Sequence, residues 1–308
     1  MNYKNWNENI INYPLTQGYE IERANSEEFA IYCITYRNVD ITFRKSWDMY
    51  YEEMKNKNNC FWIKKDNQKI GGVRMEPNYI DSLFLIPPYS DKFKVLQILK
   101  KILVHWSDKG KDIYSYSVIP SEIEDYKRIG FFTTLSLRCM IRPTEKFNLD
   151  WDGNYKIFCP VKEKDLELAK LFHEAYSDGI DDYAKQSVEQ HIIDVRSFLN
   201  EKFQEYNETI KNASAVVYDK DTNELVGVCF ITLWEGWPYL SNIAVKPTHR
   251  GKGLAEKMIK RALNILKDEY PVIRLDVLVG NSSESLYYKL GFLPGPEIAH
   301  LFLPACYR

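Results

Sequence analysis

The sequence predicts an α/β protein with a mixed (α+β) sheet, built as two tandem copies of one fold. The chain has 308 residues, which is enough for two ordinary domains. Four short patterns recur in the same order at an offset near 160 residues. Each copy alternates apolar strand-like runs with amphipathic helical stretches, as expected for helices covering a sheet.

The repeat is clearest where local structure changes. A proline ends an apolar run at both Pro87 and Pro247, and a Gly-Phe pair follows a tyrosine-bearing segment at Gly130 and Gly291. The other two matches pair a turn and strand, "NQKIGGV" with "NELVGV", and a strand and acidic helix start, "GYEIERANSEEFAIY" with "NYKIFCPVKEKDLELAKLF". The break between the copies falls in residues 142–154, where Pro, Asn, Asp and Gly interrupt the periodicity. We therefore expect domains at 1–145 and 150–308.

The second copy allows its elements to be assigned in order. The spacing of apolar residues predicts strands at 155–158, 239–245 and 272–279, a hairpin over 214–234, and helices over 163–175, 254–266 and 283–289. Gly291 is expected to end the last helix in a left-handed conformation. Residues 299–307 then form a closing strand. The resulting order is β-α-(α)-β-β-β-α-β-α-β, with helices on both faces of the sheet.

Composition excludes several classes of function. The net charge is −2, hydrophobic residues are 45% and charged residues 27%, which is typical of a globular protein with no affinity for nucleic acid. No run reaches the roughly 18 apolar residues of a membrane helix, and the first residues have no signal-peptide core. Six scattered cysteines form no metal-binding pattern. We expect a cytoplasmic protein without a metal and without a membrane partner; its oligomeric state is left open.

The segment "HRGKGLA", His249–Ala255, connects a strand to a helix and has the residues of an anion-binding turn. It lacks the Lys-Ser/Thr ending of a P-loop, and Glu256 replaces the third glycine of a dinucleotide fingerprint. Successive N–H groups at a helix N-terminus attract negative charge, and glycines at 251 and 253 let a phosphate approach the backbone. A plain flexible turn is the alternative.

Two motifs resemble the GNAT acetyltransferase superfamily. Arg250-Gly251-Lys252-Gly253-Leu254-Ala255 is similar to its acetyl-CoA motif R/Q-x-x-G-x-G/A, and "LYYKLGF", Leu286–Phe292, is similar to its LYxKxGF segment. The resemblance covers most of residues 155–308. It implies that acetyl-CoA is the cosubstrate and that Asn281 contacts its pantetheine arm, although Asn281 lies six residues before Tyr287 and the family often has seven. It implies these cofactor-binding residues: Ile243, Ala244, Val245, Arg250, Gly251, Lys252, Gly253, Leu254, Ala255 and Asn281.

The resemblance also implies direct acetyl transfer. An amine attacks the thioester carbonyl, a backbone N–H in Ile243–Val245 stabilises the oxyanion, and Tyr287 protonates the departing thiolate. A packed aromatic side chain is the alternative reading of Tyr287. Glu235 is the candidate general base, with a solvated turn residue as the alternative. Asp178, Asp181 and Asp182 lie in the expected substrate loop and suit a cationic amine, unless they are only solvated.

The first copy lacks the glycines. At the matching position it has "SDKFKV", Ser90–Val95, in which Asp91 and Phe93 replace the glycines with a negative charge and a ring. An intact copy after a degenerate copy resembles mycothiol-synthase-type tandem GNAT proteins. The sequence therefore predicts an N-acetyltransferase acting on a small primary amine. A peptide or protein N-acetyltransferase and a non-catalytic acyl-CoA-binding regulatory module remain alternatives.

Overall fold

The chain forms two compact units that are not contiguous in sequence. The computed structural model describes residues 4–307 apart from 38, 39, 42, 44, 152 and 181. One unit consists of Met1–Arg138 and Gly295–Arg308, and the other of Cys139–Pro294. Strand β7 (Phe132–Pro143) continues through the boundary, so each unit contains part of this strand.

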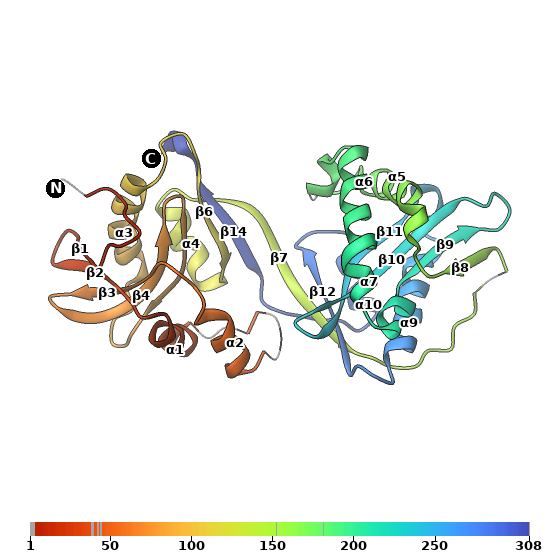
Figure 1. Cartoon of the computed structure of the whole chain (residues 1–308), viewed down its shortest axis with the longest axis horizontal. Helices are drawn as coiled ribbons and strands as arrows, with labels where there is room; N and C mark the ends of the chain where they lie inside the picture. The colour runs from red at the N-terminus through yellow and green to blue at the C-terminus, as the bar shows by residue number, and fades with distance from the viewer. Residues whose placement is uncertain are drawn as a thin grey trace. The chain divides into compact units, whose positions relative to one another are not determined.

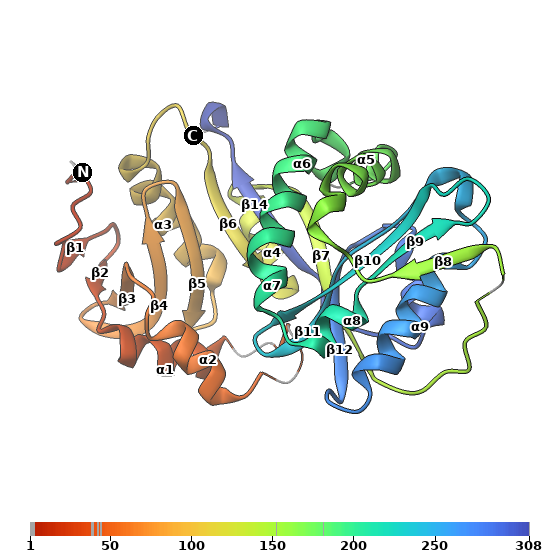
Figure 2. The same ribbon diagram turned by 45° about the vertical axis from the view of Figure 1, so that its right-hand side comes forward.

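The first unit is a mixed sheet with helices on both faces. Its further elements are β1 (Asn12–Pro14), β2 (Tyr19–Arg23), α1 (Ser26–Tyr36), α2 (Trp47–Met54), β3 (Cys60–Lys65), β4 (Gln68–Glu76), β5 (Tyr79–Leu85), α3 (Lys92–Trp106), β6 (Ile113–Val118), α4 (Pro120–Arg128), β14 (Ile298–Leu303) and η5 (Ala305–Tyr307). The strand order is β1-β2-β3-β4-β5-β6-β14-β7. Helices α3 and α4 share the larger core with the sheet, and α1 covers a smaller core around Phe29, Trp62 and Phe84. Figure 2 shows α3 running along the strands of this unit.

The second unit repeats this design. Its further elements are β8 (Tyr155–Phe158), η1 (Lys162–Lys164), α5 (Asp165–Tyr176), η2 (Asp182–Lys185), α6 (Val188–Ser197), η3 (Phe198–Lys202), α7 (Phe203–Glu205), α8 (Glu208–Ala213), β9 (Ala215–Asp219), β10 (Leu225–Trp234), β11 (Trp237–Val245), η4 (Pro247–His249), α9 (Leu254–Leu266), β12 (Val272–Leu278), α10 (Ser283–Lys289) and β13 (Leu293–Pro294). The strands follow the order β7-β12-β11-β10-β9-β8, and β13 pairs with β7. This confirms the predicted mixed sheet and its element order up to α10.

Figure 1 shows the helices that pack on the second sheet, among them α5, α6 and α9. Each face of this sheet has its own core. Helix α9 buries Leu254, Met258, Ile259, Ala262, Leu263 and Leu266 against one face, which includes most of its predicted apolar stripe. Helices α5 and α6 bury Leu168, Phe172 and Val195 against the other face. The region between α5 and β9 holds more helix than the sequence pattern predicted. Among the described helices, none is long and apolar enough to cross a membrane.

The internal repeat is visible in the strand register. Parallel strands β5 and β6 are in register at Tyr79 and Tyr114, and parallel strands β11 and β12 at Tyr239 and Arg274. Both residues of the second pair lie 160 positions after those of the first. The two units therefore place the same two strands side by side at the same point, which confirms the tandem fold predicted from the sequence.

The position of the last strand differs from the prediction. Residues 299–307 were expected to close the second domain, but β14 pairs with β6 and with the Phe132–Leu137 part of β7 in the first unit. The second compact unit ends at Pro294, and the first reaches Arg138 instead of residue 145. Strand pairing is decided by contacts between distant residues, so an apolar run alone does not show which sheet it joins.

Candidate active site

The turn between β11 and α9 has the backbone shape that its glycines suggested. Gly251 and Gly253 have φ of 75° and 74°, in the left-handed region that favours glycine. A Cβ on either glycine would meet no other atom within 4 Å, so the space beside this backbone is open. Gly253 caps α9 without any side-chain hydrogen bond, and the first N–H groups of a helix have no partner within it. The turn therefore presents free backbone donors and the positive end of a helix dipole to open space.

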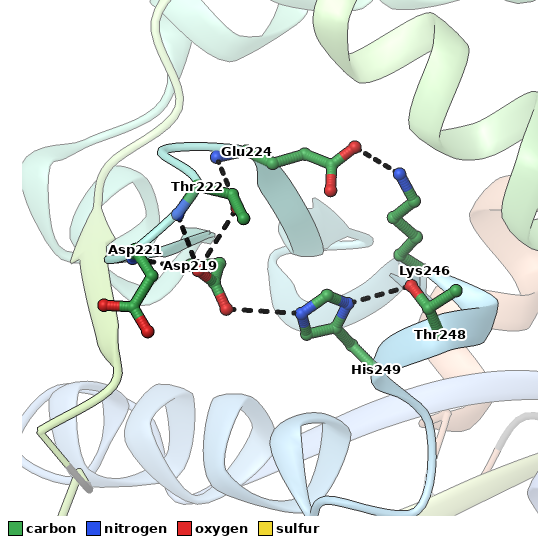
Figure 3. A network of polar contacts seen from close by, with 7 residues as sticks. All are labelled: Asp219, Asp221, Thr222, Glu224, Lys246, Thr248 and His249. Atoms are coloured by element: carbon green, nitrogen blue, oxygen red, sulfur yellow. Dashed lines mark hydrogen bonds and ion pairs between the residues drawn. The ribbon is translucent and has the colours of Figure 1, made fainter.

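The segment before the glycines is fixed by a polar network that the sequence analysis did not identify (Figure 3). His249 Nε2 lies 3.4 Å from Asp219 Oδ2, and its Nδ1 lies 3.1 Å from the Thr248 hydroxyl. Asp219 also accepts hydrogen bonds from two N–H groups of the β9–β10 turn, chiefly that of Thr222, which lower the pKa of its carboxyl group. Lys246 forms an ion pair with Glu224 of the same turn. The network holds η4 against the β9–β10 turn.

Arg250, expected to bind the cofactor, is paired with Asp178, expected to bind the substrate. The guanidinium donates to both carboxylate oxygens, over 2.6 and 3.1 Å, and to the carbonyl oxygen of Ala175 over 2.5 Å. The hydrogen bonds between the two side chains raise the pKa of Arg250 and lower the pKa of Asp178. The glycine turn is thus joined directly to the end of α5. Lys252 is exposed.

Strand β11 has an open edge at the segment expected to bind the thioester. Ile243, Ala244 and Val245 keep their partners on β10. On the other side, β12 is in register with β11 only at Tyr239, earlier in the strand. In the described part of the chain, the recorded β11–β12 register thus lies before Ile243–Val245, and we call this side of Ile243–Val245 the open edge of β11. The hydroxyl of Tyr176 donates to the Ile243 carbonyl over 3.3 Å.

Tyr287 lies on α10 with a buried ring and a hydroxyl that has no hydrogen-bond partner among the described residues. Its ring packs edge-on against Phe292, with centroids 5.8 Å apart. Burial, with a smaller contribution from Cys229, raises the pKa of Tyr287 well above its usual value. Because Cys229 lies opposite Ile243 in the β10–β11 ladder, Tyr287 approaches the sheet close to the open edge. Its phenol is protonated at neutral pH and available as a proton donor.

Glu235 lies away from this group. It occupies the β10–β11 hairpin turn with φ of 53°, and its carboxylate is 3.6 Å from the guanidinium of the buried Arg274. Ile243 lies six residue steps along the extended strand from Trp237, which corresponds to about 20 Å. The structure therefore brings Glu235 to a buried cation and not to the open edge. Its role as a general base stays a prediction.

The remaining predicted residues lie around the turn. Asn281 Oδ1 accepts the N–H of Ser283 over 2.9 Å, which organises the start of α10. Leu254 is buried in the first turn of α9, beside the half-buried Ala255. Asp181 is outside the described residues, and Asp182 is described only as the first residue of η2.

A cavity opens on the α5–α6 face of the second sheet, next to the β11 segment. Its volume is about 390 Å³. It is lined from α5, η2, α6, η3, β10 and β11 by Phe172, Tyr183, His191, Asp194, Val195, Phe198, Lys202, Tyr206, Phe230, Thr232, Leu233, Trp234, Tyr239, Ser241 and Asn242. None of these residues was predicted as a site residue, because aromatic residues on apolar faces look like ordinary core.

Comparison with known proteins agrees with the geometry. Residues 172–292 match the sequence profile of the Acetyltransferase (GNAT) family. A protein of Bacillus subtilis (strain 168), described as "Putative ribosomal protein bS18-alanine N-acetyltransferase", is 34% identical over 94 residues, which cover 29% of this chain. The match spans 62% of the relative's length.

Solved structures show the fold. A GCN5-related N-acetyltransferase from Sphaerobacter thermophilus superposes with a TM-score of 0.62 over 94% of this chain and 96% of its own, at 11% identity. An acetyltransferase from the GNAT family of Colwellia psychrerythraea gives a TM-score of 0.53 over 92% and 98% of the two chains, at 10% identity. The fold of this chain is that of GNAT acetyltransferases.

Proposed function

We propose that the second unit is an N-acetyltransferase that moves the acetyl group of acetyl-CoA directly to a primary amine. The observation that carries this proposal is the turn at Gly251 and Gly253, which offers left-handed backbone and open space at the uncapped N-terminus of α9. A pyrophosphate is the natural ligand of such a turn, because it accepts several backbone hydrogen bonds and favours the helix dipole. Lys252 and Arg250 add positive charge.

The other groups follow from this placement. The thioester carbonyl would lie at the open edge of Ile243–Val245, where an oriented N–H stabilises the oxyanion. Tyr287 would give its proton to the CoA sulfur, since its hydroxyl has no hydrogen-bond partner in the described part of the chain and its pKa is raised. Asn281 would face the pantetheine arm from the start of α10.

In the first unit, the position that corresponds to the glycine turn is the start of α3, where charged side chains contact one another and the backbone. Asp91 caps α3 by accepting the N–H of Lys94 over 2.9 Å, so a carboxylate takes one of the helix N-terminal donors that would face a phosphate. Lys92, in the first turn of α3, pairs over 2.7 Å with Glu122, which is 1% exposed. These contacts support the proposal that the first unit is a degenerate copy that does not bind CoA in this way.

The acceptor is proposed to be a small molecule. The cavity of about 390 Å³ beside β11 has the size of a small-molecule site. The description of the Bacillus subtilis relative names a protein substrate, which keeps protein N-acetylation as the second candidate. A regulatory module that binds acetyl-CoA without turnover is the third.

Thermal unfolding with acetyl-CoA tests the cofactor. A ligand at one hundred times its Kd stabilises the folded state by about 2.7 kcal/mol. We expect this stabilisation for the wild type and its loss in Gly253→Phe, because the new ring fills the space beside the turn. No stabilisation of the wild type, or equal stabilisation of Gly253→Phe, would contradict the proposal. Release of free thiol with an amine panel then separates an enzyme from a binding module.

A further inference from the structure

The cavity on the α5–α6 face has a chemical character that selects its occupant. Aromatic rings from α5, η2, η3, β10, β11 and the residue after α7 form its walls: Phe172, Tyr183, Phe198, Tyr206, Phe230, Trp234 and Tyr239. Its lining residues with full charges, Asp194 and Lys202, are both exposed, which places them at the opening. A cavity of this kind favours a compact aromatic or branched apolar body over a strongly polar one.

Two residues of the cavity lining are next in sequence to the segment expected to bind the thioester. Ser241 and Asn242 line the cavity and directly precede Ile243. The β10–β11 register shifts at Ser241, between the pairs Phe230–Asn242 and Ile231–Leu240. Such a bulge turns side chains away from the regular ladder. An amine on a molecule held in the cavity would thus lie beside the open edge of β11.

One side chain in the cavity wall is able to take up a proton. His191 of α6 is 2% exposed, and its Nε2 has no hydrogen-bond partner among the described residues. The imidazole donates instead to the backbone of Tyr183, whose ring also stacks on it at 6.3 Å. With the proton held at Nδ1, the lone pair of Nε2 is free to accept one. A buried polar atom without a partner in a ligand-sized cavity points to a partner that arrives with the ligand.

Burial, more than the surrounding charges, favours the neutral form of His191. Burial is the main cause that lowers its pKa below the usual 6.5, and the neighbouring His173 of α5 adds to this effect. Asp194 and the Tyr183 backbone act in the opposite direction. The other titratable groups lining the cavity are Lys202 and the phenols of Tyr183, Tyr206 and Tyr239. Near neutral pH, His191 is therefore a base and not an acid.

We propose that this cavity binds the acceptor as a primary amine on a compact aromatic or branched apolar body, and that His191 Nε2 takes the proton that the amine loses. This inference rests on the proposed acetyl transfer in the same unit. The partner that Nε2 lacks is then the ammonium group or a water molecule between the two.

The proton balance is complete with the residues present. The bound ammonium gives one proton to His191 Nε2, and the neutral amine attacks the thioester carbonyl carbon. The N–C bond forms as the C–S bond breaks, and Tyr287 gives its proton to the sulfur. The nitrogen releases its second proton, which restores the Tyr287 phenol through solvent, and His191 returns its proton to water. The products are the N-acetyl amine, free CoA and one proton. The apolar cavity assists the first step, because desolvation lowers the pKa of a bound ammonium group.

An amine panel, assayed by free-thiol release with saturating acetyl-CoA, tests the substrate class. We expect kcat/KM for phenethylamine, tryptamine and isoamylamine to exceed that for ethanolamine, putrescine and an Ala-initiated hexapeptide by about 10-fold or more. Ser241→Leu narrows the cavity and should raise KM for the preferred amine about 10-fold, with acetyl-CoA stabilisation unchanged. Phe198→Ala widens the cavity and should shift the amine preference toward bulkier amines. This second variant tests the cavity even if Ser241→Leu does not fold.

Different failures identify different errors. If acetyl-CoA does not stabilise the wild type, the proposed function is wrong. If acetyl-CoA binds but polar amines or the peptide react best, or neither cavity variant changes amine preference, the cavity assignment is wrong while the proposed function stands.

His191→Gln tests the base by its pH profile. The wild-type kcat should fall as pH decreases through the pKa of His191, below 6.5. His191→Gln should lose this acid limb and about 100-fold of kcat at neutral pH, with acetyl-CoA binding unchanged. The matched control is His173→Gln, since His173 is the ring next to His191 but does not line the cavity. An unchanged profile in His191→Gln, or the same loss in both variants, would overturn the assignment of His191.

Discussion

Arg250 donates two hydrogen bonds to the carboxylate of Asp178, so the glycine turn and the end of α5 are held together by one ion pair. Both side chains are substantially exposed, at 41% and 62%. Exposed pairs of this kind contribute little to stability. Asp178 instead competes with the proposed ligand, because Arg250 can contact either this carboxylate or a phosphate in the turn.

Asp178→Asn should therefore bind acetyl-CoA more tightly, by about 2- to 5-fold at low salt, because a competing negative charge is removed. The midpoint of thermal unfolding without ligand should stay within about 2 °C of the wild type. Titration calorimetry at two salt concentrations measures the effect. Asp268→Asn is the matched control, since Asp268 also forms an exposed ion pair, with Lys146. Weaker binding in Asp178→Asn would mean that the carboxylate holds Arg250 in its binding position.

Gly253→Ala should lose about 1–2 kcal/mol of folding free energy, because an L residue is strained at φ of 74°. It should also weaken acetyl-CoA binding about 10-fold or more, since the strained turn shifts its N–H donors. Gly236→Ala is a control with a matched backbone: its φ is 77°, and its Cβ would also meet nothing within 4 Å. Chemical denaturation and calorimetry together separate strain from binding. Equal binding by both variants would contradict a role of Gly253 in the turn.

Tyr287→Phe should reduce kcat about 10-fold to 100-fold and leave the KM for acetyl-CoA within about 2-fold. The loss is limited because a thiolate is a good leaving group. Stability should be unchanged, since the hydroxyl has no protein hydrogen bond to lose. Tyr288→Phe serves as the control, because Tyr288 is the next residue of α10 and is 46% exposed. Steady-state kinetics decide the matter, and full activity in Tyr287→Phe would remove Tyr287 from the mechanism.

Glu235→Gln distinguishes a counter-ion from a base. If Glu235 mainly stabilises the charge of Arg274, which is 3% exposed, the variant should lose stability by about 1–3 kcal/mol and keep kcat within a few-fold. A general base would show the reverse pattern, with about 100-fold lower kcat and unchanged stability. Urea unfolding and kinetics on the same preparation give both numbers. We expect the first pattern.

Acetyl-CoA should bind with a stoichiometry of one per chain, because Asp91 and Glu122 supply the negative charge at α3 of the first unit. Titration calorimetry of the wild type measures this directly. Gly253→Phe should bind no acetyl-CoA, whereas a chain with two working sites would lose only half of its stoichiometry. A stoichiometry of two would contradict the degenerate first copy.

The sequence allowed the glycine turn, the apolar stripe of α9 and the tandem repeat to be predicted because their signals are local. Proline, glycine and helical periodicity act within a few residues. The pairing of Arg250 with Asp178 joins residues 72 positions apart, and no local pattern indicates it. Arg274 is a charged residue in a predicted strand, and no local pattern indicates that it is buried beside Glu235. His191 lies in an ordinary amphipathic helix, and only the cavity and its unpartnered Nε2 distinguish it.

Strand β14 has a consequence for how the protein is made. The sheet of the first unit needs β6 and β7, which are synthesised early, and β14, which follows the entire second unit. During synthesis the second unit is complete at Pro294, whereas the first must keep a place open between two of its strands. Closing the sheet over this long sequence separation is intrinsically slow. The second unit should therefore mature first on the ribosome, and the first unit should be the last part to become resistant to proteases.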